Sequence, residues 1–313
     1  MLKKLTMFAG LVVLAVALAT VSGFAQVVAT PDVCSTLLSA DVTNPPATNT
    51  ATIGVASNFY YPALKFVSDY LSTVDDTAIT VCHNATATLL ANIGNYNMFF
   101  AADDSATTFD GWFDYAHGIP VLFAPYNAAA GGIANVGGLI SGWATPTDTA
   151  ATIESSVLSG YDIAASLKIS ASRDVAVAFP TLAPYGEAAE DILTAMGNAV
   201  NFNVQASPTP DWIYAPLSDN IAQTFNIVAG GTTTAKAGFI SKAQICAGIA
   251  PNIPSPNTPD YVYVAFTGED YLREQTAALT PTSNATSASL NVFIQKKINN
   301  GSWGTFLADN CYQ

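Results

Sequence analysis

Hydrophobic residues along the chain follow two spacings, one typical of short buried strands and one typical of helices. Residues 51–56 form a compact apolar run that predicts a strand, whereas residues 62–74 repeat leucine and valine at helical spacing. The same patterns predict further strands at 78–82, 97–101, 119–124, 174–179 and 237–240, and further helices at 88–93, 187–196, 220–229 and 287–299. Because strands and helices alternate, we expect an α/β chain with mostly parallel sheets.

The first 25 residues have the pattern of a secretory signal. Lys3 and Lys4 precede an apolar run from Leu11 to Leu18, and small residues follow as far as Ala25. The run is short for a bilayer span, so we expect cleavage after Ala25 and export to the periplasm. Residues 26–50 are rich in Thr, Pro, Asn and Ala, which predicts an extended leader before the folded lobes.

The charge balance excludes some classes of partner. The chain has 10 Lys+Arg against 23 Asp+Glu, and loss of Lys3 and Lys4 with the signal leaves 8 against 23, a formal charge of −15. A chain this acidic is not expected to bind nucleic acid or anionic lipid through its overall charge. Any bound anion would have to be held by local dipoles.

Four cysteines are widely spaced, at Cys34, Cys82, Cys246 and Cys311. They include no CxxC pair, so we expect neither a zinc site nor direct metal ligands. An even number in an oxidising compartment favours two disulfides. Three pairings are open and the sequence does not choose among them; our working hypothesis pairs Cys34 with Cys82 and Cys246 with Cys311.

Several predicted helices begin directly after a strand with small, hydroxyl or amide residues. These helix starts are residues 55–58, 84–88, 183–186 and 218–221. The first N–H groups of a helix lack partners within the helix and carry partial positive charge, so several starts in one cleft could bind an anion without Lys or Arg. Each start alone is more typical of an ordinary N-cap than of a ligand site.

The same segments resemble the periplasmic molybdate-binding proteins of ABC transporters. The resembling segments occur in the family's order: Ile53–Leu64 (IGVASNFYYPAL), Asn84–Ile93 (NATATLLANI), Asn97–Asp104 (NMFFAADD), Ala176–Ala189 (AVAFPTLAPYGEAA), Asp219–Phe225 (DNIAQTF) and Ala237–Ser241 (AGFIS). The stretch PTLAPYG within the fourth segment is the most specific of these. The resemblance covers roughly residues 51 to 245.

The resemblance implies a two-lobe fold of the type II periplasmic binding protein class, with mostly parallel sheets joined by a two-stranded hinge. Lobe one would comprise residues 51–123 plus 241–313, and lobe two residues 124–240. The oxyanion ligands would be Ser57, Asn58, Thr86, Tyr185 and Ile221. The first three would donate from hydroxyl, amide or backbone N–H groups, and the last two from backbone N–H groups alone. Some members of the family have a tyrosine whose hydroxyl binds the ligand at the position of Ser241. Because this chain has serine there, Ser241 is a doubtful ligand and is not counted among the five.

The function implied by the resemblance is capture of molybdate or tungstate for an inner-membrane ABC transporter permease. We expect a monomer without a cofactor, whose transported ligand is the bound oxyanion. Sequence does not separate the two ions. Residues 125–172 and 251–287 exceed the family pattern, so the same fold could instead bind sulfate, phosphate or a small carboxylate.

Two other classes of protein remain open, a hydrolase and a structural surface protein. His83, near the second helix start, is the candidate base for a hydrolase. No GxSxG, HExxH or CxxC motif accompanies it, so we expect a solvated or capping histidine and no enzyme activity.

Overall fold

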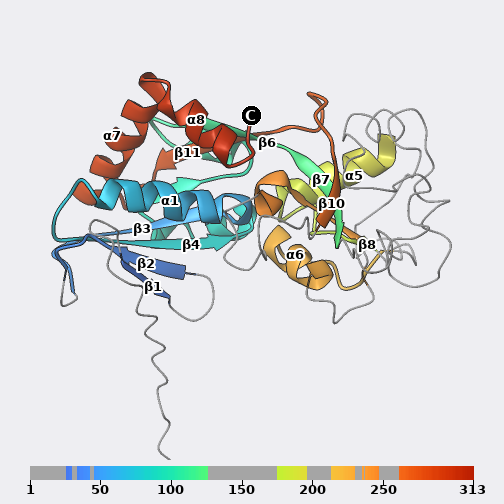
Figure 1. The fold of residues 1–313 in the computed structure, drawn as a ribbon, viewed down its shortest axis with the longest axis horizontal. Helices are drawn as coiled ribbons and strands as arrows, with labels where there is room; N and C mark the ends of the chain where they lie inside the picture. Colours follow the sequence, from blue (N-terminus) through green and yellow to red (C-terminus); the bar gives the residue numbers. More distant parts are fainter. Residues whose placement is uncertain are drawn as a thin grey trace, which may run out of the picture.

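The computed structural model describes two β-sheets with helices packed on them (Figure 1). The described residues are 26–29, 34–42, 46–125, 175–195, 213–229, 235, 237–246 and 261–313. The predicted signal segment lies outside them, as do residues 126–172 and 251–260, which belong to the segments that exceed the family pattern. Among the described residues, no helix is long and apolar enough to span a membrane.

The first sheet has seven strands in the order β1-β2-β4-β3-β5-β11-β6. Their bounds are β1 (Gln26–Ala29), β2 (Cys34–Leu38), β3 (Asn49–Ala56), β4 (Thr77–Asn84), β5 (Met98–Phe100), β6 (Phe113–Gly118) and β11 (Arg273–Leu279). Strand β3 pairs in parallel with β4 and β5, and the other neighbours pair antiparallel. Only β2 and β11 therefore run against the other strands, which confirms the expected mostly parallel sheet.

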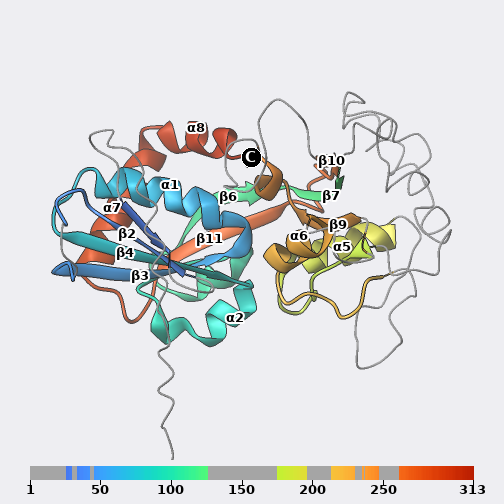
Figure 2. The same ribbon diagram turned by 60° about the horizontal axis from the view of Figure 1, so that its bottom comes forward.

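Helices cover both faces of this sheet (Figures 1 and 2). One face packs against α1 (Tyr60–Leu71), α7 (Ala285–Asn299) and α8 (Ser302–Asp309), and the other against α2 (Thr86–Ala91) and the 3₁₀ segment η3 (Asp104–Thr108). Successive side chains of β5 point to opposite faces, so Met98 and Phe100 join the first core while Phe99 joins the second. Two further 3₁₀ segments, η1 (Ser57–Phe59) and η2 (Ile93–Asn95), adjoin α1 and α2.

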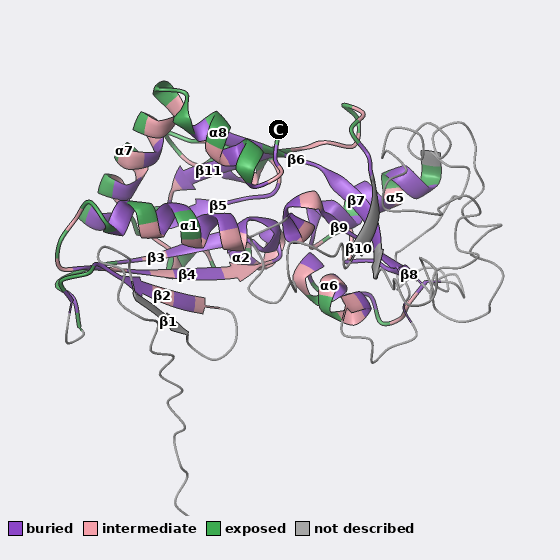
Figure 3. Cartoon of the chain, in the orientation of Figure 1, coloured by how far each residue is buried: buried purple, intermediate pink, exposed green. Residues whose placement is uncertain are grey.

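The second sheet has four described strands in the order β10-β7-β9-β8. They are β7 (Pro120–Pro125), β8 (Val175–Ala176), β9 (Ala237–Ser241) and β10 (Tyr261–Ala265), and only β7 runs against the others. Helices α5 (Pro184–Ala195) and α6 (Ile221–Ala229) pack on β9 and share its apolar core. Figure 3 shows buried residues along both sheets and exposed residues on the outer faces of the helices.

The chain passes between the sheets where β6 leads into β7 and where β10 leads into β11. Phe266 N donates to Pro120 O at 3.0 Å and so joins the two passing segments, and Lys242 N, directly after β9, donates to Ile119 O at 2.8 Å. This arrangement is the expected two-lobe fold with paired crossing segments. The segment η5 (Lys242–Ile245) follows β9 and lies beside η1 of the first lobe.

Two predicted boundaries need correction. Residues 120–123, 241 and 261–265 were expected in lobe one, but β7 pairs with both β9 and β10, so these residues belong to the second sheet. Residues 26–50 were expected as a separate extended leader, but β1 and β2 pair into the first sheet because β2 lies in register along β4. The alternation of the apolar residues in β2 was too short to signal a strand.

Both disulfides of the working hypothesis are present. Cys34 and Cys82 face each other across β2 and β4, with Cα atoms 4.0 Å apart. Cys246 and Cys311 join the end of η5 to the chain terminus, with Cα atoms 5.8 Å apart. The favoured pairing is therefore confirmed, and it fixes Cys82 directly before His83 and Cys311 directly before Tyr312.

Candidate functional site

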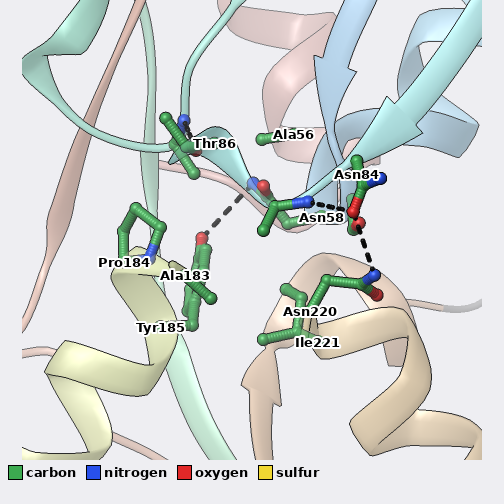
Figure 4. A pocket seen from close by; sticks show the side chains of 12 residues that line it. Ala56, Asn58, Asn84, Thr86, Ala183, Pro184, Tyr185, Asn220 and Ile221 are labelled. Carbon is green, nitrogen blue, oxygen red and sulfur yellow. Dashed lines mark hydrogen bonds between the residues drawn. The ribbon is translucent and has the colours of Figure 1, made fainter. Parts of the chain in front are cut away.

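A small pocket lies between the two lobes, where several helices begin (Figure 4). The first lobe contributes residues 56–58, 84–86 and 102, and the second lobe contributes residues 183–185 and 220–221. The space between them is small and partly open to solvent. The twelve lining residues are Ala56, Ser57, Asn58, Asn84, Ala85, Thr86, Ala102, Ala183, Pro184, Tyr185, Asn220 and Ile221.

The five predicted oxyanion ligands all line this pocket. They come from η1, α2, α5 and α6, which are far apart in the chain and meet only through the fold. Ser241 is not among the lining residues that the structure describes. Its hydroxyl instead caps η5, where it accepts from the N–H of Ala243 at 3.3 Å.

All twelve lining residues are uncharged. Within the described part of the chain there is also no group of three or more His, Cys, Asp or Glu residues that could hold a metal ion. Buried charge without a partner is very unfavourable, so any ion held here must be stabilised by neutral hydrogen-bond donors.

The helix starts at the pocket leave backbone donors available. Asn220 is the N-cap of α6, since its Oδ1 accepts from the N–H groups of Ala222 and Gln223 at 3.0 and 3.1 Å. Pro184 occupies the first position of α5, where the absent N–H is not needed. Among the described residues, none accepts a hydrogen bond from the N–H of Tyr185 or Ile221. These two groups fit the predicted role of backbone donors.

Thr86 presents a hydroxyl whose proton is still available. Its Oγ1 accepts from the N–H of Ala102 at 3.1 Å, and its side chain is buried. Accepting this bond uses a lone pair of the hydroxyl oxygen and leaves the O–H to donate elsewhere. Thr86 is therefore both anchored and able to donate to a ligand.

The Tyr185 side chain does more than the prediction assigned to it. Its hydroxyl crosses from α5 into the first lobe, where Gln275 Nε2 donates to it at 2.8 Å. Asn58 Nδ2 donates to Gln275 Oε1 at 2.9 Å and to the Tyr312 hydroxyl at 2.9 Å. Burial raises the pKa of Tyr185, and hydrogen bonds with Ser241 and Gln275 offset this only in part, so the hydroxyl stays neutral. The side chains of this set form a buried polar network behind the pocket.

Further hydrogen bonds join the lobes around the pocket. Asn220 Nδ2 donates to Asn84 Oδ1 at 3.3 Å, and Arg273 Nε donates to Pro184 O at 3.1 Å (Figure 4 shows the first). Arg273 also pairs with Asp191 at 2.7 Å. The sequence analysis did not predict Asn84, Asn220, Gln275 or Arg273 as site residues. Asn84 and Asn220 lie in two of the predicted helix starts, whereas Gln275 and Arg273 lie on β11, which carries no recognisable motif.

His83 lies directly behind Ser57. Its Nδ1 is 3.2 Å from Ser57 Oγ, and its ring packs on that of Tyr60 with centroids 4.3 Å apart. Burial lowers the pKa of His83 to about 4, so the ring is neutral near pH 7. The expectation of a solvated or capping histidine holds only in part: the residue is half-buried, and β4 places its side chain against η1.

Comparison with family models found no match, and comparison with curated protein sequences found none. Among solved structures, the chain is similar to the periplasmic molybdate-binding protein of Azotobacter vinelandii, with 20% identity and a TM-score of 0.57. The match covers 84% of this chain and 98% of that one.

Two further similar structures come from different classes of protein. One is the substrate binding domain of a putative molybdenum ABC transporter from Clostridium difficile, with 13% identity, a TM-score of 0.49 and coverage of 85% and 99%. The other is the regulatory domain of Synechocystis PCC6803 CcmR in complex with 2-PG, with 6% identity, a TM-score of 0.49 and coverage of 80% and 97%. At 20% identity, the similarity to the Azotobacter vinelandii structure establishes the fold alone, which is the type II periplasmic binding protein fold.

Proposed function

We propose that the protein is a periplasmic solute-binding protein that captures molybdate or tungstate and delivers it to an ABC transporter permease. The observation that carries this proposal is the pocket between the lobes. It gathers Ser57, Asn58, Thr86, Tyr185 and Ile221 at helix starts, and no charged side chain lines it.

Neutral donors suit a small dianion in a site of this kind. A buried dianion requires a hydrogen bond to each of its oxygens, and hydrogen bonds to a charged acceptor are about twice as strong as neutral ones. The Thr86 hydroxyl and the N–H groups of Tyr185 and Ile221 can donate, and the helix starts add partial positive charge. The overall charge of −13 offers no such attraction, so binding depends on these local groups.

Three further observations support export and delivery. The pattern of residues 1–25 predicts a secretory signal, and two disulfides are typical of an oxidising compartment. The similar structure from Azotobacter vinelandii bears the name of a periplasmic molybdate-binding protein. Closure of the two lobes over the ligand would provide the shape that a permease recognises, with the protein acting as a monomer and without catalysis.

A second candidate ligand in the same pocket is a protonated oxyanion such as hydrogen phosphate. Asn58 Oδ1 is buried and has no hydrogen-bond partner among the described residues. A buried acceptor without a partner is unfavourable, and a ligand hydroxyl would satisfy it. This observation favours phosphate over sulfate as the alternative ligand.

Calorimetric titration of the mature protein distinguishes these ligands. The proposal expects saturable one-to-one binding of molybdate and tungstate, and much weaker binding of sulfate and phosphate. Tighter binding of phosphate than of molybdate would select the second candidate. Absence of binding to all four ions would contradict an oxyanion receptor of either kind.

A further inference from the structure

Ser57 and His83 form a hydrogen-bonded pair at the wall of the pocket. Ser57 lines the pocket and is buried, and its Oγ lies 3.2 Å from His83 Nδ1. Three interactions fix the backbone and the ring of His83. Val55 of β3 pairs with His83 in the sheet, the preceding residue Cys82 is tied to Cys34, and the ring packs on Tyr60.

The pair shares protons in one of two arrangements. A serine hydroxyl has one proton, and Nδ1 of a neutral imidazole either carries a proton or accepts one. When Nδ1 lacks the proton, Ser57 donates to His83 and presents only oxygen lone pairs to the pocket. When Nδ1 carries the proton, Ser57 accepts from His83 and its O–H is free to donate into the pocket.

We infer that His83 is a positioning residue for the oxyanion: its Nδ1–H tautomer turns the Ser57 hydroxyl toward the ligand. This inference rests on the proposed function and adds a residue that does not line the pocket itself. The change between the arrangements moves one proton from Nε2 to Nδ1 by exchange with water, so the ring stays neutral and no net proton is taken up. A chain of hydrogen bonds from His83 through Ser57 to the anion polarises each bond in turn and strengthens the contact.

The surroundings of His83 leave Ser57 as its hydrogen-bond partner. The ring of Tyr60 packs on His83, but its hydroxyl forms a hydrogen bond with Ser35 Oγ at 2.6 Å rather than with the imidazole. Among the described residues, no carboxylate or cation forms an ion pair with His83. The tautomer therefore responds chiefly to what Ser57 does, and Ser57 responds to what occupies the pocket.

The tautomer can be measured directly because the chain has only two histidines. Imidazole ¹⁵N shifts distinguish a protonated from an unprotonated ring nitrogen, and the His117→Gln variant, which changes an exposed residue of β6, assigns the two sets of signals. We expect Nδ1 of His83 to be protonated in protein saturated with molybdate. A saturated protein in which Nδ1 is unprotonated would overturn the inference.

A double-mutant cycle tests whether His83 acts through Ser57. We expect Ser57→Ala to weaken molybdate binding by about 10- to 100-fold and His83→Phe by about 5- to 10-fold, since one hydrogen bond to a charged or polar partner is lost. His83→Asn retains an N–H donor near the Nδ1 position and should restore most of that loss. On the Ser57→Ala background, His83→Phe should cause no further loss.

The outcomes separate this inference from the function on which it rests. Wild-type protein that binds none of the four oxyanions would overturn both. Wild-type protein that binds molybdate, while His83→Phe weakens binding equally with and without Ser57, would overturn only the role of His83. If His83→Phe fails to fold, the ¹⁵N measurement and His83→Asn still decide the question.

Discussion

Gly118 at the end of β6 leaves the space that the Tyr185 hydroxyl occupies. A Cβ atom at position 118 would lie 1.8 Å from that hydroxyl oxygen and 2.2 Å from Gln275 Nε2. The side chain of Tyr185 reaches the first lobe only because this position has no side chain. The contact therefore lies at the start of the crossing segment between β6 and β7, where Tyr185 of the second lobe meets the first lobe.

We predict that Gly118→Ala weakens both the fold and ligand binding. The added methyl group must displace Tyr185 or Gln275, and overpacking of a buried site is destabilising by about 1–3 kcal/mol. Chemical denaturation measures the free energy of unfolding and calorimetry the affinity. Gly304→Ala is the matched control, because a Cβ there meets no atom within 4 Å. Equal stability and affinity in the two variants would show that Tyr185 is not held as described.

Thr86 provides a test of the pocket itself. Thr86→Val keeps the shape of the side chain but removes the hydroxyl, which leaves the Ala102 N–H without its acceptor and the ligand without a donor. We expect oxyanion affinity to fall by about 10- to 100-fold, as for the loss of a hydrogen bond to a charged group. Thr86→Phe should fill the space and abolish binding. Thr107→Val changes an exposed threonine of η3 and should bind as the wild type does.

The Cys34–Cys82 disulfide should contribute substantially to stability. It closes a loop with a sequence separation of 48 residues, and the chain-entropy model assigns such a loop about 4 kcal/mol. Replacing both cysteines by alanine should lower the melting temperature measured by circular dichroism. The Cys246–Cys311 bridge spans 65 residues, so its removal should have a similar effect. A change within experimental error for both would contradict a structural role of the disulfides.

The low pKa of His83 predicts how stability depends on pH. The pKa is about 4 in the folded protein and 6.5 in the reference state, so between these values the unfolded chain binds more protons. Above pH 6.5 the neutral ring contributes fully to the free energy of unfolding. This contribution falls as the pH drops from 6.5 through 4, and the total loss is at most about 3 kcal/mol. Urea unfolding at several pH values should show a steeper acid loss in the wild type than in His83→Asn. The His117→Gln variant, in contrast, should follow the wild type.

Much of the fold could be predicted from local patterns. The leucine and valine spacing that predicted a helix over 62–74 corresponds to α1, which begins at Tyr60 because η1 leads directly into it. The predicted strand at 174–179 is shorter, since only Val175 and Ala176 pair with β9 and Ala178 forms an isolated bridge. Strand β11 was not predicted because it begins with charged residues and has Gln275 at its buried centre.

The residues of the site also fall into two groups, those that local sequence patterns predict and those that they do not. Ser57, Thr86, Tyr185 and Ile221 could be selected because each lies at a strand-to-helix turn, where the chain itself signals exposed N–H groups. Gln275 and the other partners behind the pocket lie far along the chain and reach it only through sheet order and lobe contact. No local pattern predicts such contacts, because the sequence does not distinguish a buried amide side chain from any other polar residue.

The most direct test of the account is the position of molybdenum in crystals of the mature protein grown with molybdate. Diffraction data collected at the molybdenum absorption edge give an anomalous peak that locates the ion without assumptions about the protein. We expect a single peak between the lobes, with ligand oxygens at hydrogen-bond distance from Thr86 Oγ1 and from the N–H groups of Tyr185 and Ile221. A peak on another surface, or none in a crystal in which the pocket is open to the ion, would contradict the oxyanion site.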